Sequence, residues 1–213
     1  MPGPEDASSH VSPARIVVLV SGSGTLLQAL LDACAAPGFG AEVVAVGSDR
    51  PGVAALDRAV AAGVPTFVHP YAAGSDREAW DAELAEQVGR YTPDLVVSAG
   101  FLKLVGASFL AAFGGRTINT HPALLPAFPG LHGVRDALAY GVKITGATVF
   151  VVDAGVDTGV VLDQAAVPVL DDDTEDTLHE RIKVAERALL VATTSRLVTG
   201  RWRVADRKVR WDS

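Results

Sequence analysis

An asparagine and a histidine separated by one residue are the first candidates for chemistry in this sequence. They lie in Asn-Thr-His-Pro at 119–122, at the end of an apolar run that predicts a strand over 116–120. Side chains alternate along a strand, so Asn119 and His121 project from the same face. A donating amide beside an imidazole that moves a proton suits a reaction in which negative charge grows on a carbonyl oxygen. The alternative is a purely structural histidine, and the proline-rich loop at 122–130, whose backbone is restricted, argues against it.

A carboxylate in the turn Asp-Ala-Gly-Val-Asp-Thr-Gly at 153–159 is a candidate partner for this histidine. Asp157 could orient His121 and stabilise its protonated form. Aspartates also build turns, which is the role we expect for Asp153. Sequence spacing alone does not choose between the two roles for Asp157.

The third motif is a glycine-rich turn, Ser-Gly-Ser-Gly-Thr at 21–25, after a predicted strand. Small residues let backbone N–H groups approach a phosphate, and the helix that follows directs its positive end at it. Leu27 stands where a dinucleotide-binding motif has its third glycine, and the Gly-Lys-Ser/Thr of a triphosphate loop is absent. The motif therefore favours a monophosphate, and a plain tight turn is the alternative.

Strands and helices alternate around these motifs. The alternation predicts a doubly wound, mostly parallel α/β sheet flanked by helices, with right-handed crossovers. After residue 100 the pattern changes to β-rich stretches and one long helix, for which we expect an antiparallel C-terminal portion. The predicted strands cover 15–20, 41–47, 64–69, 94–99, 116–120, 142–152 and 159–169, the helices cover 53–62, 76–91, 173–199 and a segment from Leu26, and an edge strand or hairpin covers 201–211.

The helix predicted over 76–91 is amphipathic. Trp80, Leu84 and Val88 share one face, and we assign Asp81 to the polar remainder.

Composition excludes several classes of protein. The 213 residues, 49% hydrophobic and 20% charged, suit one soluble domain over 15–213 after a disordered extension at 1–14. A net charge of −7 argues against nucleic acid as a partner. No apolar run is long enough for a membrane helix, and the N-terminus does not resemble a signal peptide. The single cysteine, Cys34, makes neither a disulfide nor a zinc site, which fits the cytoplasm. A monomer and a homodimer both remain open.

Taken together, the motifs resemble the phosphoribosylglycinamide formyltransferases of the folate-dependent formyltransferase superfamily. The resemblance runs from about Arg15 to Trp211. It rests on Ser-Gly-x-Gly-x-x-Leu-Gln at 21–28, Ala-Gly-Phe at 99–101, Asn-x-His-Pro at 119–122, Leu-Leu-Pro-x-x-Pro-Gly at 124–130 and Val-Asp-x-Gly at 156–159.

The resemblance implies a role for each matching residue. Asn119, His121 and Asp157 would be the catalytic set, and 10-formyltetrahydrofolate would be the co-substrate, with no metal. The acceptor would be the amine of glycinamide ribonucleotide in purine biosynthesis. Gly22, Ser23, Gly24, Thr25, Leu26, Lys183 and Glu186 would bind the ribonucleotide, and Arg77, Leu102, Lys103, Leu104, Val105, Val152, Asp153 and Asp157 would bind the folate. Without the resemblance, Arg77, Lys183 and Glu186 would be interpreted as solvated helix surface.

Three positions depart from the family pattern. Thr25-Leu26 stands where the family often has Ser-Asn, which preserves backbone contacts to a phosphate but not an Asn side-chain contact. Lys103 replaces an expected Arg, so a point charge replaces a bidentate fork. Phe150 stands where His is common, and we assign it no role.

Alternatives within the superfamily are a formyltetrahydrofolate hydrolase and another amine formyltransferase, such as one acting on methionyl-tRNA. The hydrolase would carry an extra N-terminal domain, and the tRNA enzyme an extra C-terminal domain and a basic surface. A non-catalytic nucleotide- or folate-binding protein is the alternative from a different class, and the presence of Asn119, His121 and Asp157 argues against it.

Overall fold

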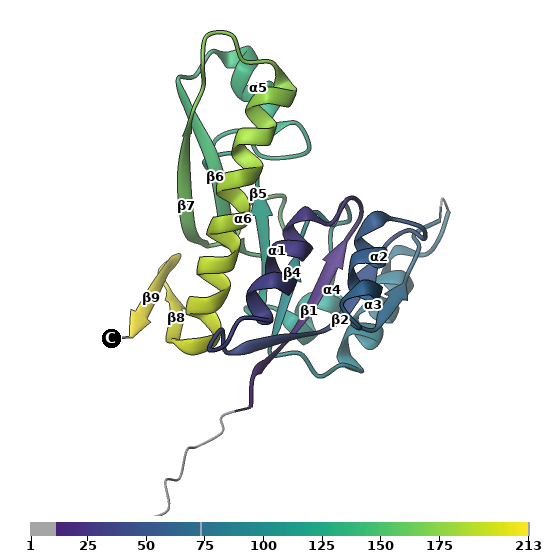
Figure 1. Ribbon diagram of the computed structural model, residues 1–213. Coiled ribbons are helices and arrows are strands. Elements are labelled where there is room, and N and C mark those ends of the chain that lie inside the picture. Colours follow the sequence, from purple (N-terminus) through teal and green to yellow (C-terminus); the bar gives the residue numbers. More distant parts are fainter. Residues whose placement is uncertain (1–11, 73, 213) are drawn as a thin grey trace, which may run out of the picture.

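A seven-stranded mixed sheet forms the centre of the computed structural model, which describes residues 12–72 and 74–212 (Figure 1). The strand order is β3-β2-β1-β4-β5-β6-β7. Strands β1 to β5 run parallel, and β6 and β7 are antiparallel additions at one edge. The strands are β1 Ala14–Val20, β2 Ala41–Ser48, β3 Thr66–Val68, β4 Leu95–Ser98, β5 Thr117–His121, β6 Ile144–Val151 and β7 Val161–Pro168. The doubly wound, mostly parallel sheet with an antiparallel C-terminal portion is confirmed.

Helices cover both faces of the sheet because its central strands are apolar on both faces. In β1, Ile16 and Val18 join a cluster with α1, α2 and α6, whereas Val17 and Leu19 join a second cluster with α3 and α4. All four residues are fully buried. Such a strand has no solvated face, as expected in a parallel sheet. The helices are α1 Thr25–Cys34, α2 Ala54–Ala61, α3 Arg77–Gly89, α4 Ala107–Phe113, α5 Gly133–Tyr140 and α6 Glu175–Thr199.

The C-terminal residues form a separate two-stranded hairpin of β8 Arg201–Ala205 and β9 Lys208–Asp212. It lies beside the lower ends of β7 and α6 (Figure 1). The extension predicted at 1–14 lies outside the described residues except for Ser12–Ala14, and Ala14 is the first residue of β1. Within the described ranges, no helix is long and apolar enough to cross a membrane.

Two helices were absent from the sequence prediction, and one burial assignment was wrong. Helices α4 and α5 have only 7 and 8 residues, too few to show a clear apolar period. Asp81, assigned to the polar face of α3, is 2% exposed. Its carboxylate accepts hydrogen bonds from the backbone N–H groups of Gly106 and Phe109, at the start of α4. A long-range cap therefore holds α4 against α3.

The direction of winding reverses between β1 and β4. Strands β2 and β3 lie on one side of β1, whereas β4 and β5 lie on the other. The loops that leave the carboxyl ends of β1 and β4 therefore diverge and leave a crevice, where open α/β sheets bind their ligands. The glycine-rich turn at 21–24 follows β1, and the segment 99–106 follows β4.

Candidate active site

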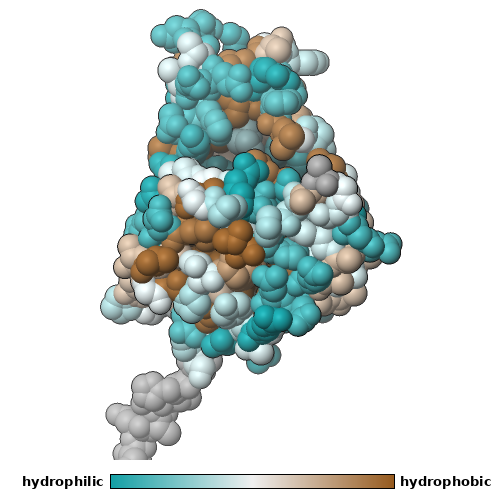
Figure 2. All heavy atoms as spheres, turned by 90° about the vertical axis from the view of Figure 1, so that its right-hand side faces the viewer, coloured by the Kyte–Doolittle hydropathy of each residue, from teal (hydrophilic) through white to brown (hydrophobic). Residues whose placement is uncertain are grey.

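One cleft of about 620 Å³ occupies this crevice. Seen from the right-hand side of Figure 1, the molecule has a narrow upper part and a broad lower part with a hollow between them (Figure 2). The cleft brings together residues from six separate parts of the sequence. Those singled out from the sequence are 22–26, 102–105, Asn119, His121, Val152, Asp153, Asp157, Lys183 and Glu186.

His121 is held on both of its ring nitrogens. Nε2 lies 2.7 Å from the carbonyl oxygen of Phe128, which can only accept, so Nε2 carries the proton. Nδ1 lies 3.4 Å from Oδ2 of Asp157. That same Oδ2 accepts a 2.7 Å hydrogen bond from the backbone N–H of Gly130. Nδ1 therefore faces a carboxylate, which would be a counter-charge for the protonated ring.

The two residues that hold the imidazole have left-handed backbone conformations. Phe128 has φ 53° and Asp157 has φ 54°. This region costs free energy for residues with a Cβ and is found where the surrounding structure enforces it. Here the conformations aim the Phe128 carbonyl and the Asp157 carboxylate at one ring from two separate loops.

Asn119 lies two residues before His121 on β5, and both line the cleft. Its side-chain amide can donate hydrogen bonds to a ligand in the cleft. Asp153 also lines the cleft, but its Oδ1 accepts from the Gly155 N–H at 3.0 Å and from the Thr158 hydroxyl at 2.6 Å. These bonds give Asp153 the turn-building role expected for it.

Helix α6 presents three polar residues to the cleft: His179, Lys183 and Glu186. Glu186 is 6% exposed. Burial raises the pKa of its carboxyl group, and a hydrogen bond from Thr120 and the charges of His121, Lys183 and Arg187 oppose that rise. Lys183 donates a 2.7 Å hydrogen bond to Glu180.

His179 is a further polar residue of the cleft that was not identified from the sequence. Burial and the charge of Lys183 lower the pKa of its imidazole. The spacing i, i+4, i+7 of His179, Lys183 and Glu186 on one helix face could have identified it.

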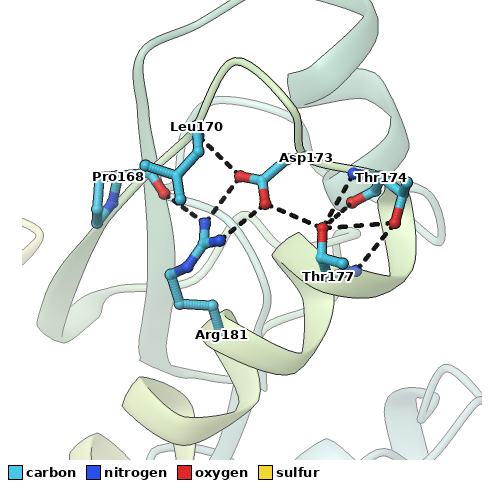
Figure 3. Close-up of polar contacts among 6 residues, drawn as sticks. All are labelled: Pro168, Leu170, Asp173, Thr174, Thr177 and Arg181. Atoms are coloured by element: carbon cyan, nitrogen blue, oxygen red, sulfur yellow. Dashed lines mark hydrogen bonds and ion pairs between the residues drawn. The ribbon is translucent and has the colours of Figure 1, made fainter.

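A network around Asp173 fixes the start of α6 (Figure 3). The carboxylate pairs with the Arg181 guanidinium through two 2.8 Å contacts and also accepts from the Leu170 N–H and the Thr177 hydroxyl. The pKa of Asp173 lies well below its usual range, first because of the hydrogen bond from Arg181. Thr174 caps the helix by accepting from the Thr177 N–H. This network sets the position from which α6 reaches the cleft.

The segment 102–106 is tied through backbone atoms. The buried hydroxyl of Ser21 accepts from the Leu102 N–H at 2.8 Å, and Asp81 accepts from the Gly106 N–H. Between these ties, the side chains of Leu102 and Leu104 are 55% and 57% exposed. They form an apolar wall of the cleft that a flat aromatic ligand can cover.

Two basic residues lie near this wall. Lys103 lines the cleft, and its Nζ lies 3.8 Å from the buried carboxylate of Asp49. Arg77 does not line the cleft. Its guanidinium lies over the rings of Tyr71 and Trp80 and donates to the carbonyl oxygen of Leu104. Arg77 therefore supports the backbone of segment 102–106, and its contact with a folate tail stays a prediction.

Fold and site together define a doubly wound α/β protein with an amide, an imidazole and a carboxylate in a cleft at its switch point. Within the described residues, no cluster of His, Cys, Asp or Glu is arranged to hold a metal ion. Residues 14–194 match the family model described as formyl transferase. The chain belongs to the formyl transferase family.

Relatives with this fold are found in several bacteria. Phosphoribosylglycinamide formyltransferase of Mycobacterium tuberculosis strain H37Rv is 59% identical over 188 residues, which cover 88% of this chain and 86% of the relative. The enzyme of the same name from Escherichia coli K12 is 40% identical over 88% of each chain. The crystal structure of glycinamide ribonucleotide transformylase 1 from Symbiobacterium toebii superimposes with a TM-score of 0.90 at 46% identity, covering 93% of this chain and 94% of that one.

Proposed function

We propose that this chain transfers the formyl group of 10-formyltetrahydrofolate to the primary amine of glycinamide ribonucleotide, a step of purine biosynthesis. The observation that carries the proposal is one cleft that is lined by Asn119, His121 and Asp157 together with the glycine-rich turn at 22–26 and the segment at 102–105. The names of the relatives agree with it. Both substrates are small molecules, and the reaction takes place in the cytoplasm.

Two groups of residues that line the cleft suit the two substrates. The backbone N–H groups at 22–26 and the Lys183 side chain bind the phosphate of the ribonucleotide. The segment at 102–105, together with Val152 and Asp153, receives the pterin ring of the folate. The formyl carbon and the amine then meet beside His121.

The amine attacks the formyl carbon directly and forms a tetrahedral oxyanion. The Asn119 amide and the protonated His121 stabilise the negative charge. Asp157 balances the charge of the imidazolium through Nδ1, while the Phe128 carbonyl holds Nε2 and thereby the plane of the ring. The bond from the formyl carbon to the folate nitrogen breaks, and the proton lost by the attacking nitrogen passes to the leaving nitrogen.

Glu186 and Lys183 bind the rest of the ribonucleotide. Glu186 is buried, and the charges of His121, Lys183 and Arg187 favour its ionised form. Its carboxylate can therefore accept hydrogen bonds from the ribose hydroxyls or the amine of the substrate. Lys183 can exchange its contact with Glu180 for one with the phosphate, because Glu180 is at the surface.

The test is an assay of 10-formyltetrahydrofolate consumption with and without glycinamide ribonucleotide, with the formylated product identified by mass spectrometry. Consumption that depends on the acceptor and yields the formylated amine supports the proposal. Consumption without the acceptor indicates a hydrolase, and no turnover indicates a binding protein. The variant His121→Asn, purified in the same way, controls for a contaminating host enzyme.

A further inference from the structure

Three consecutive carbonyl groups of the glycine-rich turn are occupied by hydrogen bonds. The Gly22 oxygen accepts from the N–H of Ala55 at 3.1 Å, and the Gly24 oxygen accepts from the N–H of Gln28 at 2.9 Å. Between them, the Ser23 oxygen accepts from Nε of Arg58 at 2.9 Å. Arg58 is the one side chain among these three donors.

These bonds determine where the N–H groups of the turn point. In a trans peptide unit the carbonyl and the N–H point in opposite directions, so fixing one fixes the other. The N–H groups of Ser23, Gly24 and Thr25 therefore point away from the groups that hold the carbonyls. Within the described residues, none of the three has an acceptor. Successive free N–H groups of this kind form a concave site for an anion.

The turn fits closely against α2. Gly24 has φ 72° and ψ 29°, and a Cβ at this residue would lie 2.6 Å from the Cβ of Ala55. Arg58 lies one helical turn after Ala55 and is partly buried. It also donates a 3.1 Å hydrogen bond from Nη1 to Oε1 of Gln28, whose own Nε2 donates to Asp32. Arg58 thus joins the turn to both α1 and α2.

We propose that Arg58 is a positioning residue for the phosphate of the ribonucleotide. It acts through the peptide unit between Ser23 and Gly24: by holding the carbonyl toward α2, it keeps the Gly24 N–H directed into the cleft. Without the guanidinium this peptide can rotate, and a carbonyl oxygen would then face the phosphate. The inference rests on the proposed function, because it assumes a substrate with a phosphate group.

The experiment compares Arg58→Met, Arg58→Lys and the control Arg187→Met. Arg187 lies in the same groove between α1 and α6 as Arg58, but it has no hydrogen bond to the turn among the described residues. The control therefore removes one positive charge nearby without releasing the Ser23 carbonyl. Two quantities are measured for each variant: the Kd of ribose 5-phosphate by calorimetry and the steady-state constants for both substrates.

For Arg58→Met we expect the Kd of ribose 5-phosphate and the KM for glycinamide ribonucleotide to rise about 10- to 100-fold, the loss expected for hydrogen bonds to a charged group. The kcat and the KM for the folate should change less than about threefold. Arg58→Lys should recover part of the affinity, because an ammonium can reach one of the two acceptors but lacks the planar fork. Arg187→Met should change the Kd less than about threefold.

Three results with the variants would overturn the inference: an unchanged Kd in Arg58→Met, an equal rise of KM for both substrates in Arg58→Met, or an equal loss of affinity in Arg187→Met. The last would show that net positive charge, not the turn, sets the affinity. A wild-type protein that does not bind ribose 5-phosphate also overturns it. If the wild type binds ribose 5-phosphate but forms no product, the proposed function fails while the Kd values still decide the role of Arg58.

Discussion

Replacing Asp157 by Asn tests whether this carboxylate acts through His121. The amide oxygen of Asn can still accept from the Gly130 N–H, so the loop keeps its hydrogen bond. What is lost is the negative charge 3.4 Å from Nδ1 of the imidazole. The protonated ring that stabilises the oxyanion then has no counter-charge, and the effect should fall on the chemical step.

The geometry sets the size of this effect. Two unit charges 3.4 Å apart attract by about 5 kcal/mol at an effective dielectric constant of about 20 and by about 1 kcal/mol in water. The His121 and Asp157 side chains are 5% and 12% exposed, which favours the larger figure. We therefore expect kcat to fall about 10²- to 10⁴-fold. The KM of either substrate should change far less, because neither is bound mainly by this carboxylate.

The assay is steady-state kinetics of Asp157→Asn, His121→Asn and the double variant. Residues that act as a unit give non-additive losses, so the double variant should be little worse than the more impaired single one. Asp171→Asn is the control, because this aspartate pairs with Lys143 at the surface and does not line the cleft, and its kcat should stay within about threefold of wild type. Near-normal kcat in Asp157→Asn, or losses that multiply, would refute the coupling of Asp157 to His121.

Three further variants probe the surrounding structure. Glu186→Gln should raise the KM for the ribonucleotide but not for the folate, and an unchanged KM would contradict this. Its Tm should exceed that of wild type increasingly as pH rises above about 4, because burial raises the carboxyl pKa and makes the ionised form costly in the folded state. Asp173→Asn should lower the Tm at pH 7, and the difference from wild type should shrink below about pH 4. The reason is that the pKa of Asp173 is depressed in the folded state, so the carboxylate stabilises the fold only while it is ionised. A difference in Tm that is independent of pH would refute this. Gly24→Ala should reduce the free energy of unfolding by about 1–3 kcal/mol in denaturant titrations. The reason is that Gly24 has a positive φ and that a Cβ at this residue would contact Ala55. A variant with the stability of wild type would show that the turn adapts to the Cβ.

The sheet could be predicted from the sequence because its central strands are buried on both faces and form continuous apolar runs. Ile16–Val20 is such a run, and the turn that follows it marks the carboxyl end of the strand. The alternation of Asn119 and His121 likewise placed both on one wall of the cleft. These inferences depend on local sequence, which is why they could be made without coordinates.

Features that depend on distant partners could not be predicted in this way. Asp81 looked like a solvated helix residue, because the backbone N–H groups that it caps belong to residues 25 or more positions later. The carbonyl of Phe128 at Nε2 of His121 has no signature in sequence. Lys183 and Glu186 were identified only through the family resemblance, and His179 on the same helix face was overlooked.

Three hydrogen bonds hold segment 102–106 through its backbone atoms: those of the Leu102 N–H, the Leu104 carbonyl and the Gly106 N–H. None of them depends on which side chains stand at 102–105. Gly106 is the exception in the segment, because a Cβ there would lie 2.8 Å from the Asp81 carboxylate. The exposed side chains of Leu102 and Leu104 can therefore be exchanged without disturbing the backbone that presents them. The apolar wall can change in this way while the contacts of His121 with Phe128 and Asp157 stay the same.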